Sequence, residues 1–339
     1  IIFLAVMISD ILLLDVFNSL GLPTSTTVSI IFELLGAAVC LALYKIYTSD
    51  ETLDHLGMYI NTKKASTIVY SILLSVILSF SLGSLIQYIS RLIFTFHYEK
   101  KLKYFGAIFG GVAISAITFF ILIKGLKDVS FISKEQSKWI TTHQLLILGG
   151  NFVFFLALSQ ILISYFKVNI LKVIILIGTF ALALAFAGND LVNFIGVPIA
   201  AFNSYEILQT SGLSGDKLMM GALANDDIVA PFYFLLLAGV VMVVTLGTSK
   251  KARSVIETEL SLSRQSEGVE KFAPNTASRF IVRFGVYTGQ AINVFLPKKL
   301  QIKIDSRFIN VEKSTKKSNE EPAFDMVRAS VNLMVASIL

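Results

Sequence analysis

The sequence predicts an all-α protein, a multi-pass transmembrane helical bundle. Its 339 residues are 55% hydrophobic and 15% charged, with a mean hydropathy of +0.73. Soluble proteins carry about 25% charged residues. The apolar residues also fall into runs long enough to cross a bilayer. The single Cys40 excludes an intramolecular disulfide and a cysteine-built metal site.

Several apolar runs have about the 20 residues that a membrane-spanning helix needs. They are Ala65–Phe94, Tyr104–Ile123, Ile140–Phe166, Ile170–Ile199 and Ile228–Leu246. Residues 1–20 are expected to form the C-terminal part of another helix, and a last apolar run begins near Phe324. Glycines 106, 110 and 111 in the second of these runs predict close helix packing.

Positive charge is concentrated in one stretch, which argues against a nucleic-acid-binding surface. Fourteen of the 29 lysines and arginines lie between Lys250 and Lys317, against six acidic residues. Basic loops favour the cytoplasmic side. We therefore expect residues 1–247 to be transmembrane, residues 248–320 to form a cytoplasmic loop and residues 321–339 to begin another transmembrane helix. Within the loop, residues 277–296 are interpreted as plain loop, with an interfacial helix as the alternative.

A first polar element follows the N-terminal helix. Gly21 and Pro23 break the backbone, and three hydroxyl residues come directly after them: Ser25, Thr26 and Thr27. In the first turn of a new helix, these hydroxyls either cap the helix or form an anion cradle with its N–H groups. We expect a re-entrant, hydroxyl-bearing hairpin here. Asp10 and Asp15, in the preceding helix, either belong to a cation path or pair with a basic residue of another helix.

A second polar element interrupts the apolar segment Ile174–Tyr205. Residues 187–190 read Ala-Gly-Asn-Asp, and Asn193, Gly196 and Pro198 follow. A central Asp costs roughly 3 kcal/mol in a bilayer, so a partner group or a bound ion must offset it. The segment predicts a broken helix over residues 170–200 that carries a functional site. The alternative is a buried polar cluster that only stabilises the break.

Together, the segments AGNDLVNFIG and LPTSTTVSIIFELLGAA resemble the inorganic phosphate transporter family, and more narrowly its longer bacterial branch. Family members carry a GANDVANA-like broken helix and a Pro-x-Ser-Thr-Thr hairpin in each of two inverted repeats. The resemblance therefore implies inverted repeats here, with most of the first repeat and the start of the second in residues 1–247. This chain departs from that pattern: it lacks the Ala between Gly188 and Asn189, and Phe194 follows Asn193. It also contains one copy of each motif, so we expect an internal fragment of a longer protein.

The resemblance implies a symporter of inorganic phosphate that is driven by sodium or protons and is not an enzyme. Phosphate contacts are implied for the three hydroxyls and for Asn189 and Asn193. Asp190 is implied to bind sodium, as the one metal ligand, or to carry a proton. The expected partners are phosphate, the coupling ion, the bilayer and a second copy of the chain. No cofactor is expected.

Other functions stay open at this point. A carrier of another oxyanion, such as sulfate, would use the same hydroxyls. An intramembrane protease would need an H-E-x-x-H motif or a helix-borne aspartate pair with a Gly-x-Gly-Asp loop. The sequence has neither, since Asp190 is preceded by Ala-Gly-Asn. A channel would need a continuous pore, which broken helices do not favour.

Overall fold

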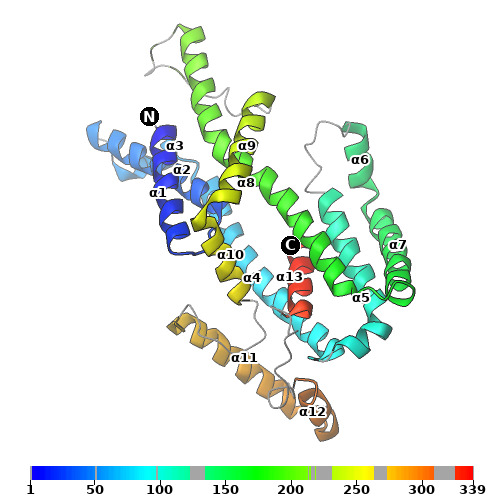
Figure 1. Cartoon of the computed structure of the whole chain (residues 1–339). Coiled ribbons are helices and arrows are strands. Elements are labelled where there is room, and N and C mark those ends of the chain that lie inside the picture. The colour runs from blue at the N-terminus through cyan, green and yellow to red at the C-terminus, as the bar shows by residue number, and fades with distance from the viewer. Residues whose placement is uncertain are drawn as a thin grey trace. The chain divides into compact units, whose positions relative to one another are not determined.

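The computed structural model describes residues 2–49, 52–96, 98–122, 134–212, 214, 218, 231–262, 273–308 and 325–338. Within these residues the chain is helical and contains no strand (Figure 1). The helices are α1 (Ile2–Ser19), α2 (Thr26–Thr48), η1 (Leu53–His55), α3 (Leu56–Tyr59), α4 (Thr62–Phe94), α5 (Glu99–Phe120), α6 (Lys134–Thr142), α7 (Gln144–Ser164), α8 (Ile170–Ser211), α9 (Phe232–Thr248), α10 (Lys250–Leu262), α11 (Thr276–Val294), α12 (Lys298–Asp305) and α13 (Met326–Ile338).

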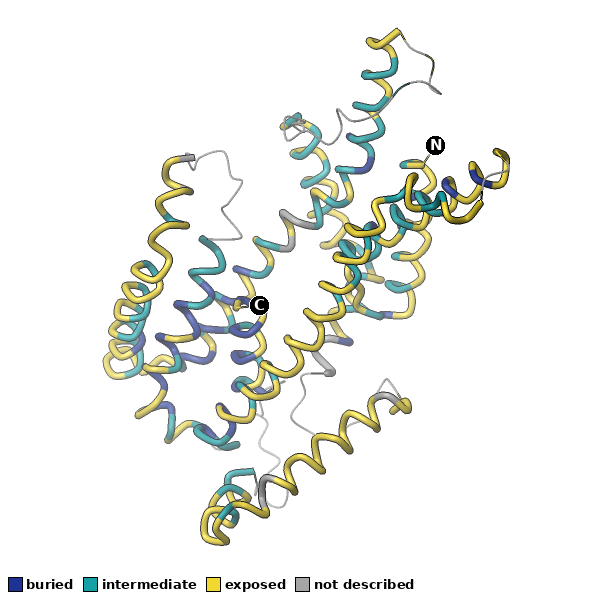
Figure 2. The backbone as a smooth tube through the Cα atoms, turned by 180° about the vertical axis from the view of Figure 1, so that it is seen from behind, coloured by how far each residue is buried: buried dark blue, intermediate teal, exposed yellow. Residues whose placement is uncertain are grey.

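The predicted multi-pass helical class is confirmed. Among the described helices, six are long and apolar enough to cross a membrane: α1, α2, α4, α5, α7 and α8. Helix α9 would add a further span if it is taken together with α10, from which it is bent by 70°. That bend falls at Ser249, directly before the basic stretch begins. Figure 2 shows long exposed stretches along these helices, as expected for surfaces that face lipid.

The prediction of a broken helix over residues 170–200 is wrong, because the backbone there is a continuous helix. Helix α8 continues through residues 187–190 and past Pro198, for 42 residues in all. Broken backbone leaves N–H and C=O groups that hydrocarbon cannot satisfy, whereas a helical glycine costs only about 1 kcal/mol. The side chains of Asp190 and Asn193 have hydrogen-bond partners on α2, so these two residues do not require the backbone to unwind. At 1.5 Å per residue, α8 is roughly 63 Å long, about twice the hydrocarbon thickness.

By contacts, the chain divides into two compact units. The first unit combines residues 1–77 with residues 184–259, and the second combines residues 78–183 with residues 260–339. The boundaries fall inside α4, α8 and α10.

The second unit holds the larger hydrophobic core. Helices α5 and α7 pack together, and α13 packs on α5. The predicted close packing of α5 is confirmed at two glycines. A Cβ at Gly110 would lie 2.5 Å from the Ser159 hydroxyl, and one at Gly111 would lie 3.0 Å from Cβ of Leu156. A Cβ at Gly110 would force its neighbours to move, and one at Gly111 would be tighter than most Cβ contacts and would require Leu156 to shift slightly.

The first unit holds the two polar elements that the sequence singled out. Helices α1 and α2 pack against each other, and a small buried cluster of Val6, Ile30 and Val197 joins them to the second half of α8. These three residues come from three different helices. The cluster therefore fixes α8 against the hairpin, near the predicted site.

Candidate functional site

The turn of the hairpin is built by Gly21. This residue has φ = +64°, in the left-handed region that glycine enters without a Cβ penalty. The Gly21 amide donates to the Asn18 carbonyl at 3.1 Å, and the Leu22 amide donates to the Phe17 carbonyl at 2.9 Å. This pair of bonds is the Schellman motif, which ends α1. Pro23 follows, where the chain leaves the first helix and approaches the second.

Ser25 is the N-cap of α2, as the capping interpretation predicted. Its backbone is extended, with φ = −98° and ψ = 114°, and its hydroxyl accepts a bond from the Val28 amide at 3.4 Å. The side chain of Ser25 is exposed. Thr26 and Thr27 therefore occupy the first two helical positions, where N–H groups have no partner inside the helix. The capping and anion-cradle interpretations are compatible in this geometry.

Asp190, Asn193 and Val197 lie on one face of α8. Their spacing of three and four residues brings them into line along the helix. Val197 is 7% exposed and packs with Val6 and Ile30 in the hydrophobic cluster. Burial of Val197 thus turns the polar residues of this face toward the start of α2.

Two hydrogen bonds join these elements across more than 160 positions of sequence. The Thr26 hydroxyl donates to Oδ1 of Asp190 at 2.6 Å. The Asn193 amide nitrogen donates to Oγ1 of Thr27 at 2.7 Å. Of the predicted site residues, Thr26, Thr27, Asp190 and Asn193 are therefore in direct contact. The side chain of Asn189 lies outside the described residues.

This arrangement combines hydrogen-bond donors with one carboxylate. Threonine hydroxyls, an amide and the first-turn N–H groups of α2 suit the oxygens of a small anion. The Asp190 carboxylate accepts bonds and, when ionised, repels an anion unless a cation or a proton intervenes. In the described part of the chain, no three His, Cys, Asp or Glu side chains come together in a metal-binding group.

Asp10 belongs to a second polar cluster on the same hairpin. It is 5% exposed, and the Ser29 hydroxyl donates to its Oδ1 at 2.9 Å. The same hydroxyl lies 3.0 Å from Oε1 of Glu33, while Oε2 of Glu33 is buried without a hydrogen-bond partner. A hydroxyl has one proton, so it cannot donate to both carboxylates at once. The second contact is therefore favourable only if a proton or a cation lies at one of the two carboxyl groups.

The sequence left open whether Asp15 belongs to a cation path or pairs with a basic residue, and the structure shows a pair. Asp15 forms an ion pair with Lys251 of α10, and both side chains are half exposed. Such exposed pairs contribute roughly 0–1 kcal/mol. The contact places the end of α1 beside the first turn of α10, where the basic stretch begins. Asp15 is thus a pairing residue and lies apart from the hydrogen bonds of the threonines.

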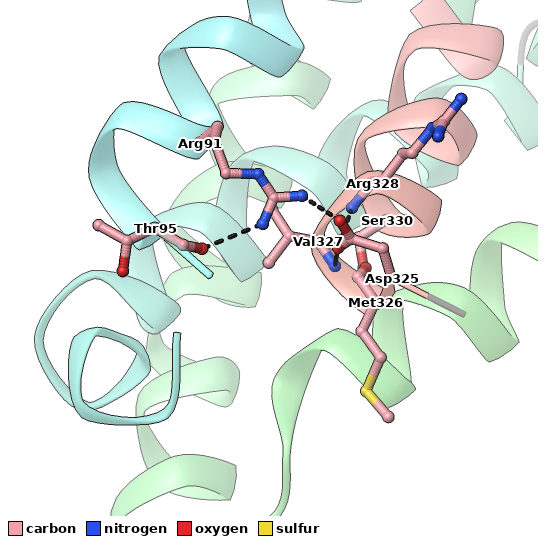
Figure 3. Close-up of polar contacts among 7 residues, drawn as sticks. All are labelled: Arg91, Thr95, Asp325, Met326, Val327, Arg328 and Ser330. Carbon is pink, nitrogen blue, oxygen red and sulfur yellow. Dashed lines mark hydrogen bonds and ion pairs between the residues drawn. The ribbon is translucent and has the colours of Figure 1, made fainter. Parts of the chain in front are cut away.

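The sequence reasoning missed a buried ion pair in the second unit (Figure 3). Arg91, near the end of α4, pairs with Asp325, and their side chains are 8% and 9% exposed. Arg91 also donates to the Thr95 carbonyl at 3.0 Å. Oδ1 of Asp325 accepts from the amides of Val327 and Arg328, both at 3.1 Å, and so caps α13. An aspartate directly before an apolar helix signals the cap, but no sequence pattern identifies the arginine 234 positions away.

A cavity of about 690 Å³ lies elsewhere, in the second unit. Its walls are mostly apolar, with Phe119, Phe120 and Phe152 among them, and it includes none of the predicted site residues. A cavity of this lining does not fit a small hydrophilic anion. The hydrogen-bonded threonine cluster is therefore the better candidate site.

Comparison with known proteins identifies a family. The sequence model of a phosphate transporter family matches residues 1–261, a range that includes the hairpin and the polar face of α8. No curated protein and no solved structure is significantly similar to the chain.

Proposed function

The chain belongs to the phosphate transporter family, and on that premise we propose that it takes part in cation-coupled symport of inorganic phosphate. The family is one of transporters, not of enzymes, and the apolar helices make the chain a multi-pass membrane protein. The coupling ion is sodium or a proton. The membrane is the cell membrane, and residues 248–320 form a cytoplasmic loop, as the 14 basic against six acidic residues between Lys250 and Lys317 favour.

The observation that carries the proposal is the contact of Thr26 with Asp190 and of Thr27 with Asn193. Phosphate binds at this contact, through the hydroxyls of residues 25–27 and the amides of Asn189 and Asn193. The first-turn N–H groups and the positive end of the α2 dipole add favourable interactions with its charge.

Coupling follows from competition for one proton of Thr26. The hydroxyl donates to Asp190, so it cannot donate to a phosphate oxygen at the same time. A sodium ion or proton on Asp190 weakens that bond and frees the hydroxyl for phosphate. The same cation removes a repulsion of order 4 kcal/mol per unit of phosphate charge, for a separation of 4 Å and an effective dielectric of about 20.

The Asp10 cluster supports a second position for the coupling ion. One hydroxyl proton lies between the carboxylates of Asp10 and Glu33, and a proton or cation is needed to balance the contact. Hard cations prefer carboxylate, hydroxyl and carbonyl oxygens. Asp10 thus belongs to the path of the coupling ion, along the same hairpin that holds phosphate.

Phosphate fits this site better than sulfate because of the Asp190 carboxylate. Near neutral pH, phosphate retains at least one proton that it can donate, whereas sulfate has none. A site with a half-buried acceptor favours the ligand that can satisfy that acceptor. The hydroxyls alone would not discriminate between the two anions.

The test is uptake by the full-length protein in proteoliposomes. Labelled phosphate and labelled sulfate are supplied separately, with a sodium gradient at constant pH or a pH gradient without sodium. We expect saturable phosphate uptake that one of the two gradients drives. Saturable sulfate uptake without phosphate transport would overturn the substrate, and phosphate uptake that neither gradient changes would overturn the coupling.

A further inference from the structure

Helix α11 presents an aromatic row with a basic row beside it. Phe280, Phe284, Tyr287 and Ala291 are separated by four, three and four residues, so they share one face of the helix. Arg279 and Arg283 follow the same spacing one position earlier and line the edge of that face. Residues 277–296 were interpreted as plain loop, and that interpretation is wrong for 276–294, which are helical.

No described side chain of α11 is buried against the rest of the chain. Phe280, Phe284 and Tyr287 are 70%, 64% and 69% exposed. Figure 2 shows the described part of this helix as exposed along its length. Aromatic side chains aligned on one face and left in water indicate a surface that is covered by a partner.

The charge of this region indicates what covers the row. From Thr276 to Lys303 the sequence contains no Asp or Glu, while α12 adds Lys298, Lys299 and Lys303 to the arginines of α11. A protein partner would need a groove that is both apolar and acidic. A bilayer with anionic headgroups offers both properties in one surface, and helices α9 and α13 on either side of this stretch are themselves apolar.

We propose that α11 lies on the surface of the chain's own bilayer and binds anionic phospholipid. The side chains of Phe280, Phe284 and Tyr287 enter the boundary between headgroups and acyl chains. Arg279 and Arg283 extend along the edge to lipid phosphates, since a long basic side chain keeps its charge at the interface while its stem is buried. Val282 and Val286, on the opposite face, stay on the water side.

The experiment places a nitroxide label on each face of α11 in the whole protein. In a background with the single Cys40 changed to Ala, the variant Ala291→Cys carries the label on the aromatic face, and Ser278→Cys carries it on the opposite face. Both substitutions replace a small side chain and keep the aromatic row. Power saturation with oxygen and with a water-soluble nickel chelate then reports depth, in vesicles of phosphatidylcholine alone or with phosphatidylglycerol.

We expect the label at position 291 to be accessible to oxygen and shielded from nickel in the anionic vesicles, and the label at position 278 to show the reverse. Changing Arg279 and Arg283 to Gln should lower the ratio of membrane-bound to free α11 about 30-fold. This factor corresponds to the free energy that two basic residues contribute near an anionic membrane surface. The matched pair Arg279→Lys and Arg283→Lys should retain binding, because it keeps the charge.

Three results would overturn the inference. The label at position 291 could remain accessible to nickel in anionic vesicles. It could be shielded from oxygen and nickel together, which would indicate that protein covers the face. The Gln variant could also bind as the unchanged protein does. None of these results depends on whether phosphate is transported, because α11 contains no residue of the proposed transport site.

Discussion

Thr26 has one hydroxyl proton, which it donates to Oδ1 of Asp190 at 2.6 Å. The neighbouring bond differs in direction, because Thr27 accepts from Asn193 at 2.7 Å. Thr26 thus contacts the carboxylate of Asp190, and Thr27 contacts the uncharged amide of Asn193. For this reason we propose that Thr26 and Asp190 carry the coupling, and that Thr27 and Asn193 orient phosphate.

Asp190→Asn should abolish the dependence of phosphate uptake on the cation gradient while the protein still inserts in the membrane. The amide has nearly the same shape, but it neither binds a cation as strongly nor carries a proton. A carboxylate–cation contact at 4 Å amounts to about 4 kcal/mol at an effective dielectric of ~20, and 1.4 kcal/mol is already a factor of ten. We therefore expect coupled uptake in proteoliposomes to fall at least about tenfold.

Thr26→Ser is the matched control for that change, since it keeps the hydroxyl and should keep coupling. Thr26→Val removes the hydroxyl and should raise the phosphate concentration needed for half-maximal uptake. Normal coupling in Asp190→Asn would remove Asp190 from the cation site. Loss of coupling in Thr26→Ser would mean that the methyl group, not the proton, carries the effect.

At the scale of elements, α4 and α13 are joined by the ion pair of Arg91 with Asp325. Arg91→Leu leaves a buried carboxylate without its cation, which typically costs 3–5 kcal/mol. We expect the midpoint of thermal aggregation in detergent to fall by on the order of 10 °C. Adding Asp325→Asn to Arg91→Leu should restore part of that loss, because the buried charge is removed and the amide oxygen still caps α13.

Lys251→Gln is the control for the Arg91 variant. It breaks the ion pair with Asp15, in which both side chains are half exposed, and so should change the midpoint by only a degree or two. If Lys251→Gln lowered the midpoint of thermal aggregation as much as Arg91→Leu does, burial of the ion pair would not explain its contribution to stability. No recovery in the double variant would mean that Arg91 acts through its bond to the Thr95 carbonyl instead.

Hydropathy was enough to predict the membrane-length helices, because length and apolar content decide them. The turn between α1 and α2 was predicted from Gly21 and Pro23 instead. Hydropathy was not enough for α8, where Thr26 and Asn193 supply bonds that let a polar segment stay helical. Chemistry predicted that Asp190, in an apolar segment, requires a partner, and the family resemblance implied that the hydroxyls of the hairpin share a site with Asn193. The Arg91–Asp325 pair was not, because nothing in either local sequence indicates the other partner. The inverted repeat and the second copy of the chain remain predictions.

At the scale of the whole molecule, orientation depends on how many helices cross the membrane between two points. Met58 in α3 and Lys298 in α12 are both exposed, and the membrane-length or apolar helices between them are α4, α5, α7, α8 and α9. An odd number of crossings puts the two positions on opposite sides. With residues 248–320 in the cytoplasm, residue 58 is then outside.

We expect Met58→Cys, in the Cys40→Ala background, to react with a membrane-impermeant maleimide on intact cells. Lys298→Cys should react only after the cells are opened, because the basic loop stays inside. Labelling of Lys298→Cys in intact cells would contradict the proposed orientation. Labelling of both positions from one side would mean an even number of crossings. The element to revise would then be α8, whose 42 residues are about twice what one crossing needs.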